Sequence, residues 1–157
     1  MTIKLVCIGK TDNKELESLI EIYKNRLQHY IKFDFEIIPV LKKVKNLDEN
    51  QQKTKEGELI LGGIQNSDFV VLLDENGKQF SSETFSEYLQ KRMNTGLKKL
   101  IFVIGGPYGF SEEVYSRADS KISLSKMTFS HQMVRLFFTE QLYRGFTILK
   151  NEPYHHR

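Results

Sequence analysis

Two hydrophobic spacings follow each other along this chain, one typical of strands and one typical of helices. The clearest strand pattern covers residues 100–104, where every side chain is apolar. Such a run suits a strand that is buried on both faces of a parallel sheet. The other expected strands are an opening run at 3–8, an alternating and half-exposed run at 33–37, a run at 69–73 and a short run at 121–124.

Helical spacing fills most of the intervals between these runs. After the first strand, apolar residues recur at helical spacing up to Ile31, and Asp12 with Glu15 forms a possible capping box. A lysine-rich stretch, 41–55, predicts a loop that runs into a helix at about Asn50. Further helices are expected after Ser81 or Ser82, over 111–118 and after Ser130, and a turn is expected at 75–78.

Strands and helices therefore alternate along the whole chain. This order predicts an α/β fold, with a mostly parallel sheet and helices on both faces. The 157 residues are enough for a sizeable hydrophobic core. Because no repeat or linker interrupts the pattern, we expect a single domain over residues 1–157.

The composition is that of a folded protein and leaves several partners open. With 39% hydrophobic residues the chain is expected to fold, and no apolar run approaches the ~20 residues of a membrane span. The net charge of +3 permits an anionic partner without requiring one. Since the first residues lack a signal-peptide layout, we expect a cytoplasmic protein without a membrane partner.

Metal and disulfide chemistry are not expected. The one cysteine, Cys7, excludes an intrachain disulfide and a cysteine zinc cluster. Cys7 lies in the first strand pattern and is expected to be a small buried hydrophobe. No group of histidines and acids has the spacing of metal ligands.

The strand at 100–104 ends in a glycine-rich loop. Gly105, Gly106 and Pro107 follow it directly, and Gly109 comes shortly after. Ligands of open α/β sheets bind at the carboxyl ends of strands, where glycine lets the backbone approach them. A tight strand-to-helix turn without a ligand explains the same residues, and the loop alone does not decide between these interpretations.

A long final helix follows a polar loop. His131 and Arg135 are four residues apart, so they are expected to share a face near the start of this helix. A cationic face there would suit an anionic group, although His131 alone could be structural. The broad apolar stripe around Met133, Phe137 and Phe138 indicates a buried helix or an oligomer interface.

The tail at 151–157 has an unusual composition. Tyr154, His155, His156 and Arg157 combine a ring for stacking, imidazoles and a phosphate-binding guanidinium, which are useful groups at an RNA site. Composition alone favours a frayed end.

Several motifs in order resemble a known family. The runs 104–109 and 124–131 resemble the two cofactor loops of the knotted SPOUT methyltransferases. Residues 6–10, 73–74, 141–144 and the ending 153–157 are similar to one branch, the ribosomal RNA large subunit methyltransferase H family. The resemblance runs from end to end, although Ser130 stands where many relatives have proline.

The resemblance implies an activity and an assembly. Members of that family transfer a methyl group from S-adenosylmethionine to N3 of a pseudouridine in a stem-loop of large-subunit (23S) ribosomal RNA, and they act as homodimers with a deep trefoil knot. We expect the substrate to be RNA within the assembled ribosome. By position, the expected cofactor-binding residues are Leu73, Gly105, Gly106, Leu124, Ser125, Lys126, Met127, Thr128 and Phe129.

The chemistry needs few catalytic groups. Methyl transfer from a sulfonium is mainly a problem of positioning, but the imide proton on N3 must leave. An imidazole could accept that proton, or a cation could stabilise the anion. The expected catalytic candidates are His131, Arg135, Tyr154, His155 and Arg157.

Three other functions compete with this one. A dinucleotide-dependent oxidoreductase would want its glycine loop early in the chain, with an acid about 20 residues later. A non-enzymatic ribosome-binding protein would explain the basic charge but not two cofactor-like loops. A SPOUT RNA methyltransferase with a different target nucleotide remains a further alternative. Titration with S-adenosylmethionine and with a nicotinamide cofactor separates enzymes of these kinds from a simple binder.

Overall fold

A computed structural model describes residues 1–42 and 44–156 of the chain. In this part of the chain five strands form one sheet in the order β2-β1-β4-β3-β5, and every pair of neighbouring strands is parallel. The strands are β1 (Thr2–Ile8), β2 (Lys32–Ile38), β3 (Phe69–Gln79), β4 (Lys99–Ile104) and β5 (Ser120–Ser123).

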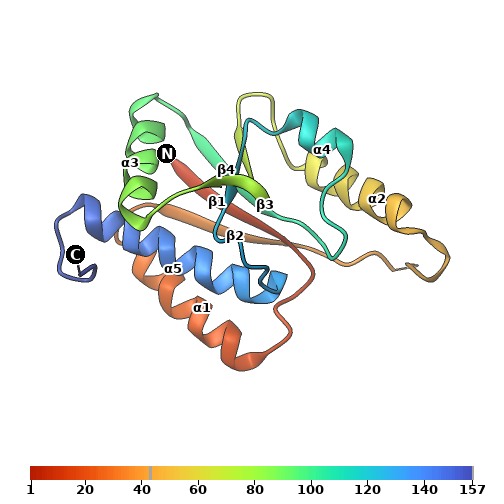
Figure 1. Cartoon of the computed structure of the whole chain (residues 1–157), viewed down its shortest axis with the longest axis horizontal. Helices are drawn as coiled ribbons and strands as arrows, with labels where there is room; N and C mark the ends of the chain where they lie inside the picture. Colours follow the sequence, from red (N-terminus) through yellow and green to blue (C-terminus); the bar gives the residue numbers. More distant parts are fainter. Residues whose placement is uncertain (43, 157) are drawn as a thin grey trace.

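Helices cover both faces of this sheet (Figure 1). On one face α5 (His131–Leu149) packs against α1 (Lys14–Leu27) and α3 (Ser82–Asn94). On the other face α2 (Glu49–Gly62) packs against α4 (Glu112–Arg117), and a short 3-10 turn, η1 (Val44–Asn46), precedes α2. The predicted α/β fold, with a parallel sheet between two helical layers, is confirmed.

Successive residues of the central strands point into two separate cores. In β4, Phe102 packs with the core under α1, α3 and α5, whereas Val103 packs with the core under α2 and α4. The same alternation places Leu5 of β1 in the first core and Val6 in the second. Because both faces are covered, β1 from Leu5 to Ile8 and β4 from Leu100 to Ile104 are apolar at every position rather than at alternate ones.

Cys7 lies in the first core and is fully buried. Burial raises the pKa of its thiol to about 12, against a smaller opposing effect of Arg135. The thiol therefore stays protonated at neutral pH, as a small buried hydrophobe should. None of the helices in the described residues is long and apolar enough to cross a membrane.

Two local expectations were wrong. Asn13, not Asp12, caps α1, because its side chain accepts a hydrogen bond from the backbone of Leu16. Residues 75–78 are not a turn, because β3 continues through them with a shift of register between Leu73 and Lys78 in its pairing with β5.

Gly77 explains why β3 can continue. A Cβ at Gly77 would lie 2.6 Å from backbone atoms of Ile122 in β5, so only glycine permits this close approach of the two strands. The turn-like composition around Gly77 therefore reflects tight strand packing.

We predict that Gly77→Ala lowers the free energy of unfolding by about 1–3 kcal/mol, because the added methyl forces β3 and β5 apart. Gly62→Ala is the matched control, because a Cβ at Gly62 meets nothing within 4 Å, and alanine favours a helix. Urea unfolding of both variants measures the difference. Equal stability of the two variants would contradict the close approach.

Candidate active site

A cavity of about 490 Å³ lies at the carboxyl ends of β4, β3 and β5. Parallel pairing places Leu73 of β3 beside Ile104 of β4 and also beside Ile122 of β5, and all three residues line the cavity. A cavity of this size suits a ligand of drug or nucleoside dimensions. The ligand interpretation of the glycine loop is therefore favoured over an empty turn.

The glycine loop forms one wall of the cavity. Gly105 and Gly106 line it, and a Cβ at Gly105 would come within 3.2 Å of the Phe110 ring. Phe110 is buried and makes an edge contact with Tyr115 of α4. The loop is thus backed by aromatic rings and has no free space for a side chain at Gly105.

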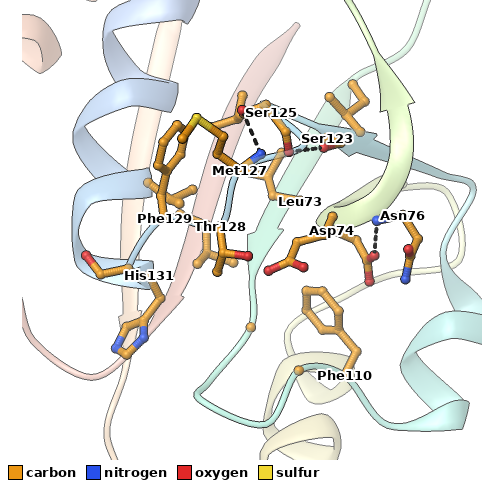
Figure 2. Close-up of a pocket in the computed structure, with 18 of the residues that line it drawn as sticks. Leu73, Asp74, Asn76, Phe110, Ser123, Ser125, Met127, Thr128, Phe129 and His131 are labelled. Carbon is orange, nitrogen blue, oxygen red and sulfur yellow. Dashed lines mark hydrogen bonds between the residues drawn. The ribbon is translucent and has the colours of Figure 1, made fainter.

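Asp74 places a carboxylate at the same wall. Its side chain accepts hydrogen bonds from the backbone of Asn76 and from the hydroxyl of Tyr115. Burial, and then the hydrogen bond to Asp74, raise the pKa of Tyr115 to about 12, so its hydroxyl remains a donor. Figure 2 shows the Asp74 carboxylate turned toward Asn76, with the Phe110 ring next to it, on the side of the cavity away from Met127 and Thr128.

The second loop, residues 124–129, forms the opposite wall and is held by its own hydrogen bonds. The Ser123 hydroxyl donates to the carbonyl of Ser125 at 2.8 Å, and the Ser125 hydroxyl accepts from the backbone of Met127 at 3.0 Å (Figure 2). The members of this loop that line the cavity are Leu124, Ser125, Met127, Thr128 and Phe129. Lys126 does not line it and is exposed.

His131 and Arg135 do not converge on this cavity. His131 lines it at the first turn of α5, directly after the Ser130 cap. Arg135 is fully buried and donates to the carbonyl of Ile8 at 2.8 Å and to the hydroxyl of Thr11 at 3.2 Å. Its guanidinium therefore ties α5 to the end of β1 rather than presenting a charge to a ligand.

The tail is folded back against α5. The Tyr154 hydroxyl donates to Glu140 at 2.8 Å, and Arg144 contacts Nδ1 of His155 at 3.1 Å. Arg144 also forms a salt bridge with Glu140, four residues before it on α5, and this pair holds the tail. Near the start of the tail, the Tyr30 hydroxyl donates to Glu152 at 2.6 Å. The frayed end favoured by composition is wrong for the described tail residues.

Tyr154 and His155 do not line the cavity of the chain to which they belong. Glu140 follows His131 by nine residues, about 13 Å along the helix axis at ~1.5 Å per residue. The tail groups that meet Glu140 are thus separated from His131 by more than two helical turns. Arg157, the remaining candidate, lies outside the described residues.

A second cavity, of about 420 Å³, adjoins the first along α5. The two share Leu124 and Phe129, and the second extends to Phe137 and Glu140. Met133 and Phe137 are 37% and 38% exposed, whereas Phe138 is fully buried between Phe85 and Phe102. The exposed part of the predicted stripe is therefore narrower than expected, because Phe138 belongs to the core.

A family model described as "Predicted SPOUT methyltransferase" matches residues 1–155. The chain belongs to the SPOUT methyltransferase family. It is 90% identical over 157 residues to a protein of Christiangramia forsetii named "Ribosomal RNA large subunit methyltransferase H", with 100% of each chain covered. A Flavobacterium johnsoniae protein of the same name is 69% identical over 157 residues, again with 100% of each chain covered.

A solved structure shows the same fold at much lower identity. It is titled as a probable methylase family protein from Haemophilus influenzae and superposes with a TM-score of 0.55 at 14% identity. The match covers 95% of this chain and 66% of that longer chain. This likeness concerns the fold alone.

Asp74 and Phe110 line the first cavity but were not among the expected site residues. Each stands next to a recognised feature, since Asp74 follows Leu73 and Phe110 follows Gly109. Their positions, directly after Leu73 and directly after the last glycine of the loop, were a usable signal. No group of three or more metal-binding side chains occurs within residues 1–42 and 44–156.

We predict that Arg135→Met lowers the free energy of unfolding by about 1–3 kcal/mol, because the buried carbonyl of Ile8 loses its donor. The control is Gln132→Ala, which removes exposed hydrogen bonds to the neighbouring Lys10 and Asp12 and should change stability by less than about 0.5 kcal/mol. Urea unfolding measures both. If Arg135→Met were as stable as the control, the anchoring role would be wrong.

Proposed function

We propose that this chain is an S-adenosylmethionine-dependent methyltransferase that methylates N3 of a pseudouridine in a stem-loop of 23S ribosomal RNA. The observation that carries the proposal is the full-length 90% identity to a protein named as a large-subunit ribosomal RNA methyltransferase. The cavity at the strand ends supports it, because two loops of the kind expected for the cofactor form its opposite walls.

The cavity has the character that this cofactor requires. Its apolar lining from Leu73, Ile104 and Ile122 suits a flat adenine ring. Its polar groups at Asp74, Ser125 and Thr128 offer hydrogen bonds to a ribose and an amino acid moiety. Gly105 leaves the glycine-loop wall without a side chain, so the backbone can approach the ligand closely.

The protein's main contribution is position. When bound, S-adenosylmethionine supplies an electrophilic methyl group on a positively charged sulfur. The cavity walls hold the ligand in one orientation, so that a nucleotide entering from the open side meets the methyl group in line. The proton on N3 of the pseudouridine has to pass to a nearby acceptor or to water.

The described residues differ in their ability to accept that proton. Burial, together with hydrogen bonds to Tyr23 and Glu140, raises the pKa of Tyr154, so its phenol remains protonated and acts as a donor. Arginine can only donate, so Nδ1 of His155 accepts from Arg144 and a neutral His155 carries its proton on Nε2. His131, at the cavity, is therefore the proposed proton acceptor.

A homodimer would bring the separated groups together. Phe129 and Phe137 line the second cavity, and together with the exposed Met133 of α5 they supply an apolar surface for a second copy. In a two-fold dimer built on α5, the tail of one chain can lie over the first cavity of the other. We propose that the site is completed in this way and that the dimer acts on the assembled ribosome, since a net charge of +3 is small for gripping free RNA.

A methylation assay tests the function. Undermethylated ribosomes, separate subunits and a short RNA hairpin are incubated with radiolabelled cofactor, and the product nucleoside is identified by mass spectrometry. We expect N3-methylpseudouridine, with ribosomes as the preferred substrate. A different methylated nucleoside would indicate another target, and binding without methylation would indicate a non-enzymatic partner of the ribosome.

We predict that Gly105→Val weakens S-adenosylmethionine binding by at least about 100-fold, because the added side chain collides with Phe110 and fills the cavity. Lys126→Ala is the control from the opposite wall, and its affinity should stay within about twofold because Lys126 does not line the cavity. Calorimetry measures both. Wild-type affinity in Gly105→Val would place the cofactor elsewhere.

Subunit complementation tests the shared site. Deleting residues 153–157 should leave cofactor affinity nearly intact but lower turnover by about 100-fold or more. Mixed dimers of this truncated chain with Gly105→Val contain one intact cavity facing one intact tail. Co-refolding equal amounts should restore about a quarter of the wild-type rate if sites form across the two-fold axis. No recovery in mixed dimers would mean that each chain uses its own tail.

A further inference from the structure

Glu56 is a buried acid beneath the glycine loop. It lies on α2, is 3% exposed, and its Oε1 has no hydrogen-bond partner among the described residues. Glu56 does not line the cavity, so it has no direct contact with a ligand there. A buried carboxyl without a charged partner is unfavourable for stability and calls for an explanation.

The absence of a side chain at Gly106 makes room for this carboxyl. A Cβ at Gly106 would lie 2.6 Å from Oε1 of Glu56 and 2.8 Å from Oε2. The carboxyl thus lies directly against the Gly106 backbone, on the side of the loop away from the cavity. At the next residue, a Cβ on Gly57 would collide with the Ser111 hydroxyl, so α2 is also closely packed against the start of α4.

The surroundings of Glu56 favour its neutral form. Burial raises the pKa of its carboxyl above the ordinary 4.5, and a hydrogen bond with Gln52 opposes this only in part. No charged group is among the causes of this shift. Gly106 of the glycine loop lies against Glu56, and Ser111 and Val114 at the start of α4 lie against the adjacent Gly57; none of these three residues titrates.

We propose that Glu56 is a positioning residue for the cofactor: as a neutral acid it donates a hydrogen bond to the glycine-loop backbone at Gly106 and holds the loop in its ligand-binding shape. A neutral carboxyl has one O–H donor, and the adjacent loop backbone offers carbonyl acceptors. Bound cofactor presses on the same loop from the opposite side. This inference rests on the proposed function, because it concerns the same cavity.

Proton linkage tests the proposal. If cofactor binding favours the neutral acid, wild-type protein takes up protons from the buffer on binding S-adenosylmethionine, in a pH range above 4.5 where Glu56 titrates. Calorimetry in buffers of different ionisation enthalpy measures this uptake. Glu56→Gln, which keeps a donor but cannot titrate, should lack it. The α-amino group of the cofactor contributes equally to proton uptake in both proteins. The difference in proton uptake between wild type and Glu56→Gln is therefore due to Glu56.

Affinity and a matched control complete the experiment. Glu56→Gln should bind within about twofold of wild type at low pH and hold its affinity as the pH rises, whereas Glu56→Ala should bind about tenfold more weakly than Glu56→Gln at every pH. Glu58→Gln, an exposed position on the same helix, should behave as wild type. The proposal would be overturned if wild type and Glu56→Gln exchanged the same number of protons on binding, or if wild type released protons. Full affinity in Glu56→Ala would also overturn it. A wild-type protein that binds no S-adenosylmethionine would instead overturn the proposed function.

Stability provides an independent readout. Because the pKa of Glu56 is raised in the folded protein, its ionisation destabilises the fold increasingly as the pH rises above about 4.5. Glu56→Gln should therefore melt at a higher temperature than wild type at neutral pH and at the same temperature below pH 4.5. Glu56→Gln would then be more stable than wild type but would take up no protons on cofactor binding. A purely structural role of Glu56 does not explain proton uptake on binding.

Discussion

The approach of β3 to its two neighbours is the constraint on which the site depends. Leu73 can line one cavity with Ile104 and Ile122 only because both adjacent pairings are parallel and bring the carboxyl ends together. The pairing with β5 continues past a register shift, where Gly77 lies against the backbone of Ile122. The two loops that face each other across the cavity leave from β4 and β5, so their separation follows from this strand packing.

The long helix α5 connects the cavity to β1 and to the tail. Its first turn borders the cavity at His131, and one turn later Arg135 fastens it to the end of β1. Glu140, in the middle of the helix, accepts a hydrogen bond from the hydroxyl of Tyr154 in the tail. A straight helix cannot bring its own start and middle together, so any chemistry that needs both His131 and Tyr154 calls for a second chain.

The sequence predicted those features that depend on local pattern. Apolar runs located the five strands of the described residues. Helix starts were expected after Ser81 or Ser82, at Ser111 and after Ser130, and the observed caps Ser81, Ser111 and Ser130 agree because the capping hydrogen bond is local. Features set by distant contacts were missed. The turn expected at 75–78 is strand because β5 pairs with it, and the tail is ordered because Tyr30 and Glu140 bind it.

The two walls of the cavity are supported in different ways, which bears on how each responds to a ligand. The 124–129 loop is held by hydrogen bonds from Ser123 and Ser125, which lie within or directly before it. The glycine loop also has an internal hydrogen bond, from the Gly109 N–H to the Gly106 carbonyl at 3.1 Å, but it packs in addition against the carboxyl of Glu56 on α2. A loop that packs against a side chain of a neighbouring helix is coupled to any shift of that helix. Ligand binding should therefore be communicated to α2 through the glycine loop rather than through the loop that begins α5.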